Sequence, residues 1–419
     1  MNYKKPSPAD SRRINRSEIL RKIYFEGPIS RLEVSQQIGI SPATVTNIVN
    51  NLLEKKILME SGIRQSEGGR PSTLLTINPD YGYFLGIEVG ETFIQVELFD
   101  ILFNLCQKSF SSLNTPKISP HQIVLGMLQG IEDVISRSKL SEKEIIGGGI
   151  GFPGLVDPIK GVSVFTPNWG WHNVSIASQL RERLSIPIYI DNGAKAMAIG
   201  EMLFGAGRGV NNITVLLVGT GVGSGIITER TLFRGSSNNA GEFGHTTLNM
   251  DGPQCRCGSH GCVEVYIGAN GIISRYQKLT SDTPVLSVDD QIAFIKFLLS
   301  EYEVGNSAAI QTLNETVRYL GVTIANLINA YNPELLLLGG WSGLLLGSKF
   351  LSQIEEVVAQ YAIRQSLSKT TIRLCQLGQD SVAKGAASLV LEHFFETAGE
   401  SESMVIGGKV VDRIYKHNT

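Results

Sequence analysis

Two stretches of this chain constrain its fold most. In each of them an apolar strand leads into a glycine turn, and a second strand follows the turn. They read GIEVGETFIQVELFD, at residues 86–100, and NITVLLVGTGVGSGII, at residues 212–227. A strand-like segment at 145–157 and a helical stretch from about 307 to 331, which leads into another buried strand, alternate with them. This alternation predicts an α/β body, and one turn in each half of it predicts two lobes that close over a cleft. Backbone N–H groups of such turns can hold phosphates, although ordinary hairpins contain glycine too.

The length and the composition set the broad class of protein. A chain of 419 residues, 42% of them hydrophobic, is too long for one typical core, and we expect three parts at 1–78, 79–395 and 396–419, the last without an assigned role. No apolar run approaches ~20 residues and the first residues resemble no secretory signal, so we expect a cytoplasmic protein without a membrane partner. Five cysteines, an odd number, argue against a disulfide framework.

The charge is distributed unevenly along the chain. Residues 1–70 contain 12 Lys and Arg against 7 Asp and Glu, whereas the whole chain has a net charge of −2. A basic head on an acidic body suggests that the head alone contacts a polyanion. Short basic segments are also common by chance, so the charge needs support from the pattern of residues.

Three helices are expected in this basic head. RSEILRKIYFEG, residues 16–27, has one apolar face and stops at a glycine. SRLEVSQQIGI, residues 30–40, opens with Ser30 and Glu33 in the spacing of a capping box. The third helix is expected in SPATVTNIVNNLLEKKIL, residues 41–58; it has Ser41 as its N-cap and a proline in its first position, and its apolar residues line one face.

The second and third helices, with the glycine turn between them, form a helix-turn-helix pattern, and the two strand-like stretches that follow, 56–62 and 70–78, form a wing. Small polar side chains of a recognition helix can bind phosphates and base edges, and arginines of a wing can enter a minor groove. A three-helix bundle used for dimerisation is the alternative, but turn, polar face, wing and charge together favour DNA binding. The residues expected to contact DNA are Ser41, Thr44, Thr46, Asn47, Asn50, Arg64 and Arg70.

Seven motifs of the body occur in an order that resembles the ROK family, which groups bacterial sugar kinases with sugar-responsive repressors on an actin/hexokinase-like fold. They are GIEVGET, GIGFPGLVD, PNWGW, IDNGAKAMAIGE, GTGVGSGI, GEFGH and CRCGSHGCVE, and they cover about residues 80–390. With the winged head attached, the chain is most similar to the repressor branch, and within it to xylose repressors. The resemblance implies an α/β fold in which a winged helix-turn-helix domain precedes a two-lobed actin/hexokinase-like domain.

The motif CRCGSHGC, together with GEFGH before it, indicates a metal site. Three thiolates and an imidazole would hold a tetrahedral Zn²⁺ ion with no open position, which is the arrangement of a structural site. The expected ligands are His245, Cys255, Cys257 and Cys262. His260 is a rival fourth ligand, and the resemblance favours His245; buried or redox-active cysteines are the alternative to a metal site. Cys106 and Cys375 are expected to be ordinary core cysteines.

A neutral sugar is bound by fixed hydrogen-bond donors and acceptors, and carboxylates that accept from two hydroxyls suit this task. The resemblance implies that five side chains contact the sugar: Asn168, Asn192, Glu242, His245 and Glu264. Trp169 or Trp171 can stack on the sugar ring or can belong to the core. The zinc would brace the segments that carry Glu242 and Glu264, for which a pair of ordinary surface carboxylates is the alternative.

The corner IDNG, residues 190–193, departs from the kinases of the family. The resemblance implies that in those kinases the corner reads Asn-Asp, and that the aspartate is the general base for the sugar hydroxyl. This chain has Gly193 at that position, and Asp191 would point away from the site in an extended segment. The first glycine turn has Glu88 and Glu91 where the kinases have aspartate and glycine, so we expect like charges to oppose ATP there.

These observations predict a sugar-responsive transcriptional repressor without enzymatic activity. Its partners would be operator DNA at the head and a monosaccharide between the lobes, with xylose as the first candidate and glucose as the second. The resemblance implies a homodimer or a larger oligomer, and hence a palindromic operator. An active ATP-dependent sugar kinase with a DNA-binding head is the alternative, and Gly193 and Glu91 argue against it. A ligand-blind repressor is the third interpretation, and the retained sugar-binding side chains argue against that one.

Overall fold

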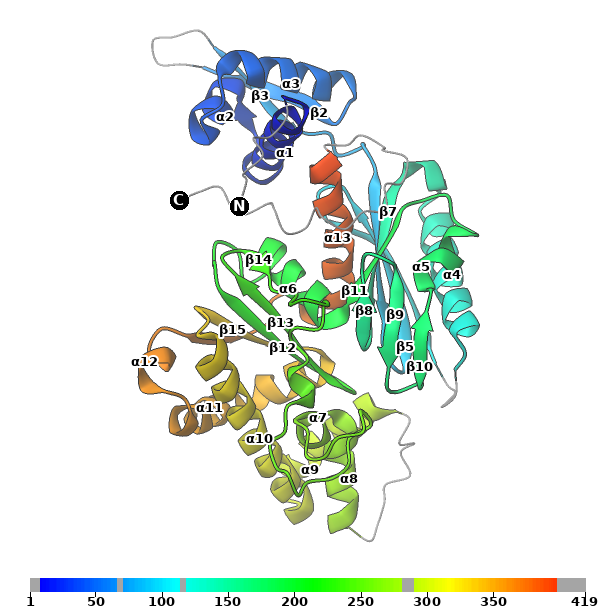
Figure 1. Cartoon of the computed structure of the whole chain (residues 1–419), viewed down its shortest axis with the longest axis vertical. Coiled ribbons are helices and arrows are strands. Elements are labelled where there is room, and N and C mark those ends of the chain that lie inside the picture. Colours follow the sequence, from blue (N-terminus) through cyan, green and yellow to red (C-terminus); the bar gives the residue numbers. More distant parts are fainter. Residues whose placement is uncertain (1–7, 66–70, 114–117, 281–289, 398–419) are drawn as a thin grey trace.

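The structure, a computed structural model, describes residues 8–65, 71–113, 118–280 and 290–397. A small head sits on a larger body, and the body divides into two lobes (Figure 1). None of the helices in the described ranges combines the length and the apolar character that a bilayer span requires. The predicted fold class is confirmed, because a head of helices and strands precedes a two-lobed α/β body.

The head consists of three helices and a three-stranded antiparallel sheet. The elements are α1 (Pro8–Glu26), β1 (Ile29–Ser30), α2 (Arg31–Ile38), α3 (Pro42–Glu54), β2 (Leu58–Arg64) and β3 (Ser72–Ile77), with the strands in the order β1-β3-β2. Ser30 and Glu33 form the predicted capping box at the start of α2, and Gly39 ends that helix in the left-handed conformation, with φ 71°. The Ser41 hydroxyl accepts a hydrogen bond from the Thr44 N–H and caps α3. The predicted boundaries on both sides of the turn are confirmed.

The helices of the head pack their predicted apolar faces together. Leu20 of α1 and Val45 and Val49 of α3 are buried in one core with side chains of the sheet. Helix α1 begins at Pro8, earlier than the apolar stretch that predicted it. The tip of the wing, which carries Arg70, lies outside the described residues.

The first lobe of the body is built on a five-stranded sheet. Its strands are β4 (Tyr83–Val89), β5 (Phe93–Asp100), β6 (Leu105–Ser112), β7 (Ile145–Phe152) and β11 (Ile188–Asn192), in the order β11-β7-β4-β5-β6. Helices α4 (Pro120–Arg137) and α5 (Ile176–Arg181) cover one face, and α13 (Ser381–Thr397) covers the other. A second sheet consists of β8 (Leu155–Asp157), β9 (Val162–Thr166) and β10 (Trp171–Val174). Because β4 and β11 both run parallel to β7, the carboxyl ends of these three strands meet at one edge.

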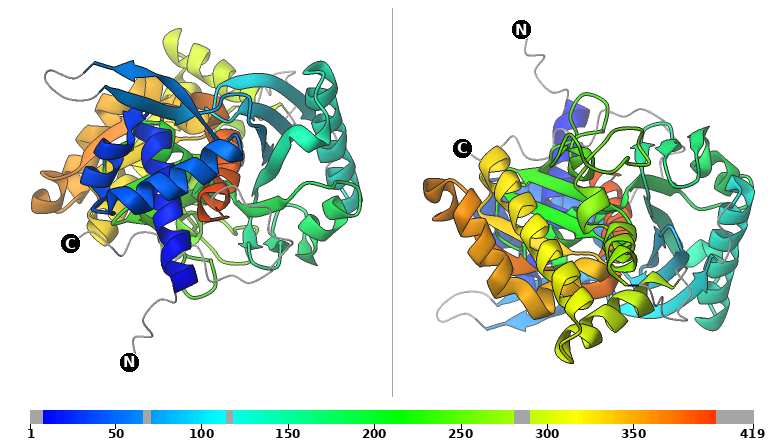
Figure 2. Two further views of the ribbon diagram at one scale, coloured as in Figure 1. Left: turned by 90° about the horizontal axis from the view of Figure 1, so that it is seen from above. Right: turned by 90° about the horizontal axis from the view of Figure 1, so that it is seen from below.

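The second lobe repeats this plan. Its strands are β12 (Ile213–Val218), β13 (Val222–Thr228), β14 (Thr231–Leu232), β15 (Leu335–Gly339) and β16 (Thr371–Leu374), in the order β14-β13-β12-β15-β16. Helices α8 (Ala269–Leu279), α9 (Gln291–Glu303), α10 (Ser307–Tyr331) and α11 (Trp341–Tyr361) form one layer on this sheet, seen from below in Figure 2. Helix α6 (Gly193–Phe204) packs on the other face, and α7 (Glu264–Ile267) and α12 (Arg364–Leu367) are short. The long helix predicted at about 307–331 is confirmed as α10.

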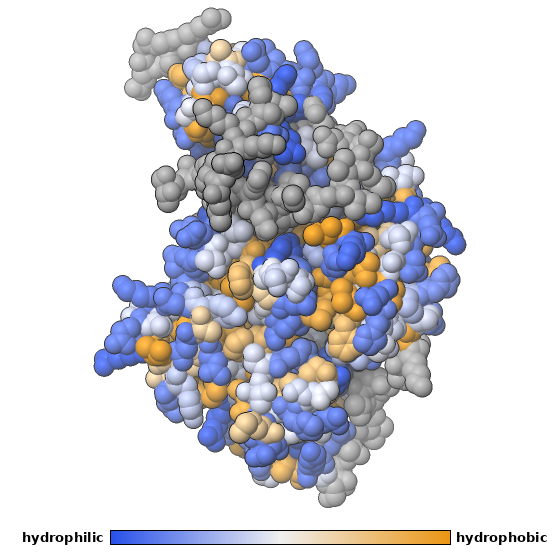
Figure 3. Space-filling view, in the orientation of Figure 1, coloured by the Kyte–Doolittle hydropathy of each residue, from blue (hydrophilic) through white to orange (hydrophobic). Residues whose placement is uncertain are grey.

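Helix α13 lies between the first sheet, α6 and the head. Gly86 of β4 and Gly149 of β7 face carbonyl groups of α13, and Gly385 of α13 faces a carbonyl group of α6, so a Cβ at any of the three would collide with an oxygen. Further along α13, Glu392 accepts hydrogen bonds at 2.9 and 2.7 Å from the guanidinium of Arg21 in the head. Hydrophobic residues gather beside α13 on the face of the body shown in Figure 3.

Candidate functional site

The corner IDNG lies where β11 ends and α6 begins. The amide oxygen of Asn192 accepts hydrogen bonds from the N–H groups of Ala194 and Lys195, at 2.9 and 3.3 Å. Its amide nitrogen donates to the Gly154 carbonyl at 2.9 Å. Asn192 is therefore the N-cap of α6, its oxygen is fully engaged, and one amide hydrogen is left for a ligand.

Gly193 occupies the first position of α6, with open space beside it. A Cβ at this position would lie 3.5 Å from Val382 Cγ1 and 4.0 Å from the Phe152 carbonyl oxygen, which are ordinary van der Waals distances. Asp191, two residues earlier, is buried and forms an ion pair with Arg234 at 2.6 Å. The corner therefore has room for a side chain at residue 193 but presents no carboxylate there, and Asp191 is held by a partner of its own.

A buried lysine that the sequence analysis did not single out lies next to the corner. Lys195 is 2% exposed, and its ammonium group donates to the Asn238 carbonyl. Burial lowers the pKa of Lys195, and nearby Asp191 and Glu242 oppose that shift. Burial raises the pKa of Glu242 to about 7; Lys195 opposes this change and Glu264 reinforces it. Within the described part of the chain the Glu242 carboxylate has no hydrogen-bond or ion-pair partner, so it is available to a ligand.

A second residue that was not predicted, Arg256, joins the two lobes. It belongs to the cysteine-containing loop of the second lobe, and its Nη1 and Nη2 donate to the two carboxylate oxygens of Glu91, in the first glycine turn, at 2.6 and 2.5 Å. Its Nε donates to Glu264 at 2.8 Å, and Nη1 also donates to the side-chain oxygen of Asn168 at 3.1 Å. The other Glu264 oxygen accepts from the Val222 N–H at 3.0 Å. The guanidinium thus brings together Asn168 and Glu264, two predicted sugar contacts from different lobes.

The carboxylates of the first glycine turn are not the bare charges that the sequence suggested. Glu91 is bound at both oxygens by Arg256; burial raises the pKa of Glu91, and the guanidinium opposes that shift. Burial, reinforced by Glu97, raises the pKa of Glu88 to about 8, so Glu88 is largely neutral at pH 7. The negative charge at this turn is therefore smaller than the sequence suggested, and its expected repulsion of ATP is weaker.

The two tryptophans of PNWGW have different environments. Trp171 is 8% exposed and packs against Trp169, with ring centroids 4.5 Å apart. Trp171 belongs to the hydrophobic core of the first lobe, whereas Trp169 is only partly buried at the edge of that core. Of the two rings, Trp169 is the more accessible to a ligand.

The four predicted metal ligands lie close together in the segment that precedes α7 in the chain. The ligand atoms of His245, Cys255, Cys257 and Cys262 all lie within 4.8 Å of one another. The distance from His245 Nδ1 to Cys255 Sγ is 3.6 Å, and that from Cys257 Sγ to Cys262 Sγ is 3.8 Å. Zinc bonds of ~2.3 Å to sulfur and ~2.0 Å to nitrogen give tetrahedral edges of about 3.6–3.8 Å, so the donor set fits this ion. The rival ligand His260 is exposed and lies outside the cluster.

The two cysteines outside this cluster differ from each other. Cys375 is buried, as predicted. Cys106 is exposed, and its assignment to the core was wrong. The reason is its place on β6, which forms the edge of the first sheet and turns several side chains to solvent.

The residues predicted to contact DNA lie on α3 and on the wing. Three of them are exposed on α3: Thr46, Asn47 and Asn50. The hydroxyls of Ser41 and Thr44 are hydrogen-bonded to each other at 2.8 Å at the start of that helix. Arg64, on β2, forms an ion pair with Glu33 of α2 at 2.6 Å, so its side chain is directed toward that helix. Arg70 lies outside the described residues, and its predicted contact with DNA stays a prediction.

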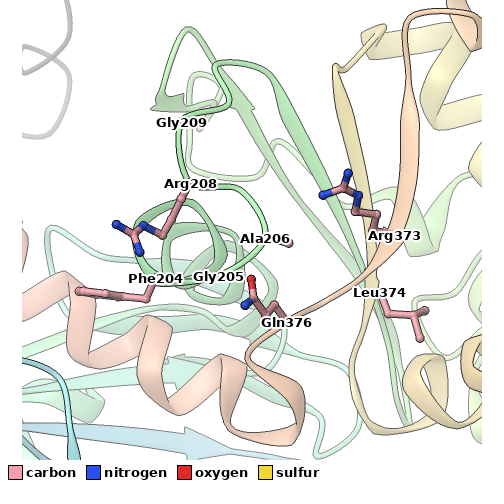
Figure 4. Close-up of a pocket in the computed structure, with 8 residues that line it drawn as sticks. All are labelled: Phe204, Gly205, Ala206, Arg208, Gly209, Arg373, Leu374 and Gln376. Atoms are coloured by element: carbon pink, nitrogen blue, oxygen red, sulfur yellow. The ribbon is translucent and has the colours of Figure 1, made fainter.

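A cavity of about 800 Å³ opens at the end of α6 opposite the corner (Figure 4). Its lining residues are Phe204, Gly205, Ala206, Arg208, Gly209, Arg373, Leu374 and Gln376. None of the predicted site residues lines it. Arg208 points away from Arg373 in Figure 4, so the two guanidinium groups do not converge on one ligand.

Comparison with known proteins gives matches over the body and over most of the chain. The profile described as "ROK family" matches residues 84–393. The xylose repressor of Bacillus spizizenii is 32% identical over 387 residues, which cover 92% of this chain and 97% of the relative. The N-acetylglucosamine repressor of Escherichia coli O157:H7 is 27% identical and covers 78% of this chain and 80% of the relative.

Among solved structures, too, some match most of this chain and others match a shorter part of it. A ROK family transcriptional regulator, described as a homolog of the E. coli MLC protein, covers 92% of this chain and 97% of its own, with a TM-score of 0.78 and 22% identity. A ROK family glucokinase from Streptomyces griseus, solved with glucose and AMPPNP, covers 74% of this chain and 99% of its own, with a TM-score of 0.59 and 25% identity. The regulators therefore match over a longer part of this chain than the glucokinase does.

Proposed function

The chain belongs to the ROK family, and from this premise we propose that it is a sugar-responsive transcriptional repressor. The head, residues 1–78, binds operator DNA, and the body, residues 79–395, binds a monosaccharide without phosphorylating it. One observation carries the proposal: a winged helix-turn-helix head is joined to a kinase-like body whose corner has glycine at residue 193. The similarity to a xylose repressor over 92% of the chain supports both parts of the proposal.

The proposed sugar site lies between the lobes, around the corner and Arg256. Glu242 offers an unpaired carboxylate, and Asn168 and Glu264 each keep acceptor capacity beside the guanidinium. Asn192 adds one amide hydrogen. D-xylose is the first candidate and D-glucose the second, because relatives of this chain are named xylose repressors.

We assign one structural Zn²⁺ ion to the cluster of His245 and the three cysteines. The ion would fix the loop that carries Arg256 and the start of α7, which carries Glu264, and it supplies no chemistry to a ligand. With Nδ1 on the metal, His245 keeps its other ring nitrogen for a sugar hydroxyl, which reconciles its two predicted roles.

The DNA contacts are assigned to the exposed polar face of α3 and to the wing. One recognition helix reads one half-site, so we propose a homodimer or larger oligomer on a palindromic operator. A sugar that favours one arrangement of the two heads would change the affinity for the operator by population shift.

The second candidate function is an ATP-dependent sugar kinase, which the likeness to the glucokinase favours. Two features argue against it. Residue 193 has no side chain that can take a proton from a sugar hydroxyl, and Asp191 is paired with Arg234. The repressor is therefore the function that the site supports best.

The test uses the purified full chain and genomic DNA fragments selected by binding to it. Titration with D-xylose and D-glucose is expected to change the affinity for the selected fragments, whereas L-xylose, the mirror-image control, is not. The same protein with Mg-ATP and each sugar is expected to form no sugar phosphate. Efficient phosphorylation, or selected DNA whose binding neither sugar alters, would contradict the proposal.

A further inference from the structure

The ion pair between Arg256 and Glu91 lies where the two glycine turns of the body meet. Glu91 is part of the first turn, between β4 and β5. A Cβ at Gly221 in the second turn would lie 2.8 Å from Arg256 Nη2 and 3.2 Å from Glu91 Oε1. The side chains of Arg256 and Glu91 are only 25% and 11% exposed, so the pair is largely shielded from solvent. A guanidinium–carboxylate pair thus fills the space between two turns of the kind that hold phosphates.

We propose that Arg256 is an interlobe latch, and that the ion pair it forms with Glu91 occupies the space between the turns in which a phosphate would otherwise be held. Arg256 binds Glu91 of the first lobe and Glu264 of the second, and it holds the two turns together in the protein without sugar. It also positions the acceptors that a sugar needs. The role of Arg256 in holding the two turns together rests on geometry alone, whereas its role in positioning acceptors for a sugar rests on the proposed function.

The chemistry of the guanidinium suits this task. Arginine has five N–H donors in a rigid planar fork, and a lysine at residue 256 would present a point charge instead. Four donors are used: two on Glu91, one on Glu264 and one on Asn168. Gly221 gives the fork its room, because a side chain there would meet both members of the pair. The second glycine turn therefore has a structural use that requires no nucleotide.

The latch leaves room for a sugar to add to it. Glu264 Oε2 accepts one hydrogen bond, from the Val222 N–H, and has a second lone pair for a hydroxyl; Oε1 accepts from Arg256 and, at 4.0 Å, from the Cys255 thiol. Asn168 also keeps one lone pair, and one N–H of Arg256 is unused. A sugar that bridges Asn168 and Glu264 would therefore strengthen the contact between the lobes. By linkage, an intact latch would in turn raise the affinity for the sugar.

The first test measures amide hydrogen exchange on the full chain without sugar. The variant Glu91→Gln is expected to speed exchange about tenfold in the peptides that cover both turns, including the Val222 N–H, because a charge-assisted contact between the lobes is lost. Arg256→Lys is expected to act in the same direction. Glu303→Gln is the matched control: it removes an ion pair with Lys349, at 2.5 Å, that lies within the second lobe.

The second test is calorimetric titration with D-xylose, repeated with D-glucose. Glu91→Gln is expected to raise the dissociation constant about tenfold although Glu91 itself is not a sugar contact, while the zinc content matches that of Glu303→Gln. If the amides of the two turns exchange at the wild-type rate in both Glu91→Gln and Arg256→Lys, the proposed latch is excluded. Wild-type protein that binds neither sugar would overturn the proposed function and the positioning role, and the exchange experiment would still decide whether the lobes are latched.

Discussion

Replacing Gly193 with aspartate separates two explanations of the corner: a catalytic base that was lost, and a position that cannot hold one. The space beside residue 193 accepts a Cβ at 3.5 Å from its nearest neighbour, so the substitution has no steric cost at that atom. Replacing a glycine whose backbone conformation other residues can adopt stabilises by roughly 0.4–1 kcal/mol through the unfolded chain, and a carboxylate in the first turn of a helix adds roughly 0.3–1 kcal/mol. Residue 193 is half-buried, so partial desolvation of the new carboxylate offsets part of this gain. We expect the free energy of unfolding of Gly193→Asp to be unchanged or higher by up to about 1 kcal/mol, measured by urea denaturation.

The same variant is not expected to be a kinase. A general base contributes about 100- to 10,000-fold to such a reaction, but the Arg256–Glu91 pair still occupies the space between the glycine turns. Only the double variant Gly193→Asp with Glu91→Gly is expected to form sugar phosphate, and slowly. The assay incubates each variant with Mg-ATP and D-xylose or D-glucose and detects sugar phosphate by phosphorus NMR. Gly193→Asn, which fills the same space without a basic oxygen, is the control; unfolding of Gly193→Asp, or its rapid turnover with Glu91 in place, would refute the reasoning.

Three further predictions concern the head, the metal and the first lobe. Thr46→Ala and Asn47→Ala are expected to weaken binding to the selected DNA about 5- to 100-fold, by fluorescence anisotropy, with the sugar affinity unchanged; equal DNA affinity would remove this face of α3 from recognition. Elemental analysis is expected to find one zinc per chain, and Cys257→Ser to lower both the zinc content and the melting temperature; a metal-free native protein would exclude the site. Burial, reinforced by Asp380, raises the pKa of Glu97 from 4.5 to about 8, so the folded state favours the protonated form and stability should fall as the pH rises from 4.5 to 8. Glu97→Gln should flatten that slope in urea titrations at several pH values, and an unchanged slope would assign it to other groups.

The sequence predicted best those features that depend on neighbours along the chain. The ends of α2 and the start of α3 follow from Ser30, Gly39 and Ser41, which bond to the backbone within a few residues. The corner between β11 and α6 was predicted for the same reason. The first residues of α1 were missed, because they carry no apolar period that would indicate a helix.

The features that sequence reasoning missed depend on contacts between distant segments. Arg256 and Glu91 are far apart in the chain and meet only because the two lobes face each other. Lys195 interrupts an apolar helix, and this was the available signal, but its partner Asn238 lies 43 residues further along the chain, in the loop after β14. A buried charge at the start of an otherwise apolar helix requires polar partners, and those partners can come from any part of the chain.

Helix α13 has a mechanical consequence for communication between the ends of the molecule. Where side chains separate two elements, a small shift of one can be absorbed by rotamer changes before it reaches the other. At Gly86, Gly149 and Gly385 the backbones of two neighbouring elements are in direct contact, so no side chain lies between them that could absorb a displacement. The same helix holds the head through Glu392 and Arg21. Phe395 of this helix also packs on Tyr24 of the head, with ring centroids 5.1 Å apart. Motion of α6 at the corner should therefore reach the DNA-binding end as a rigid displacement, and Glu392→Gln should weaken that coupling.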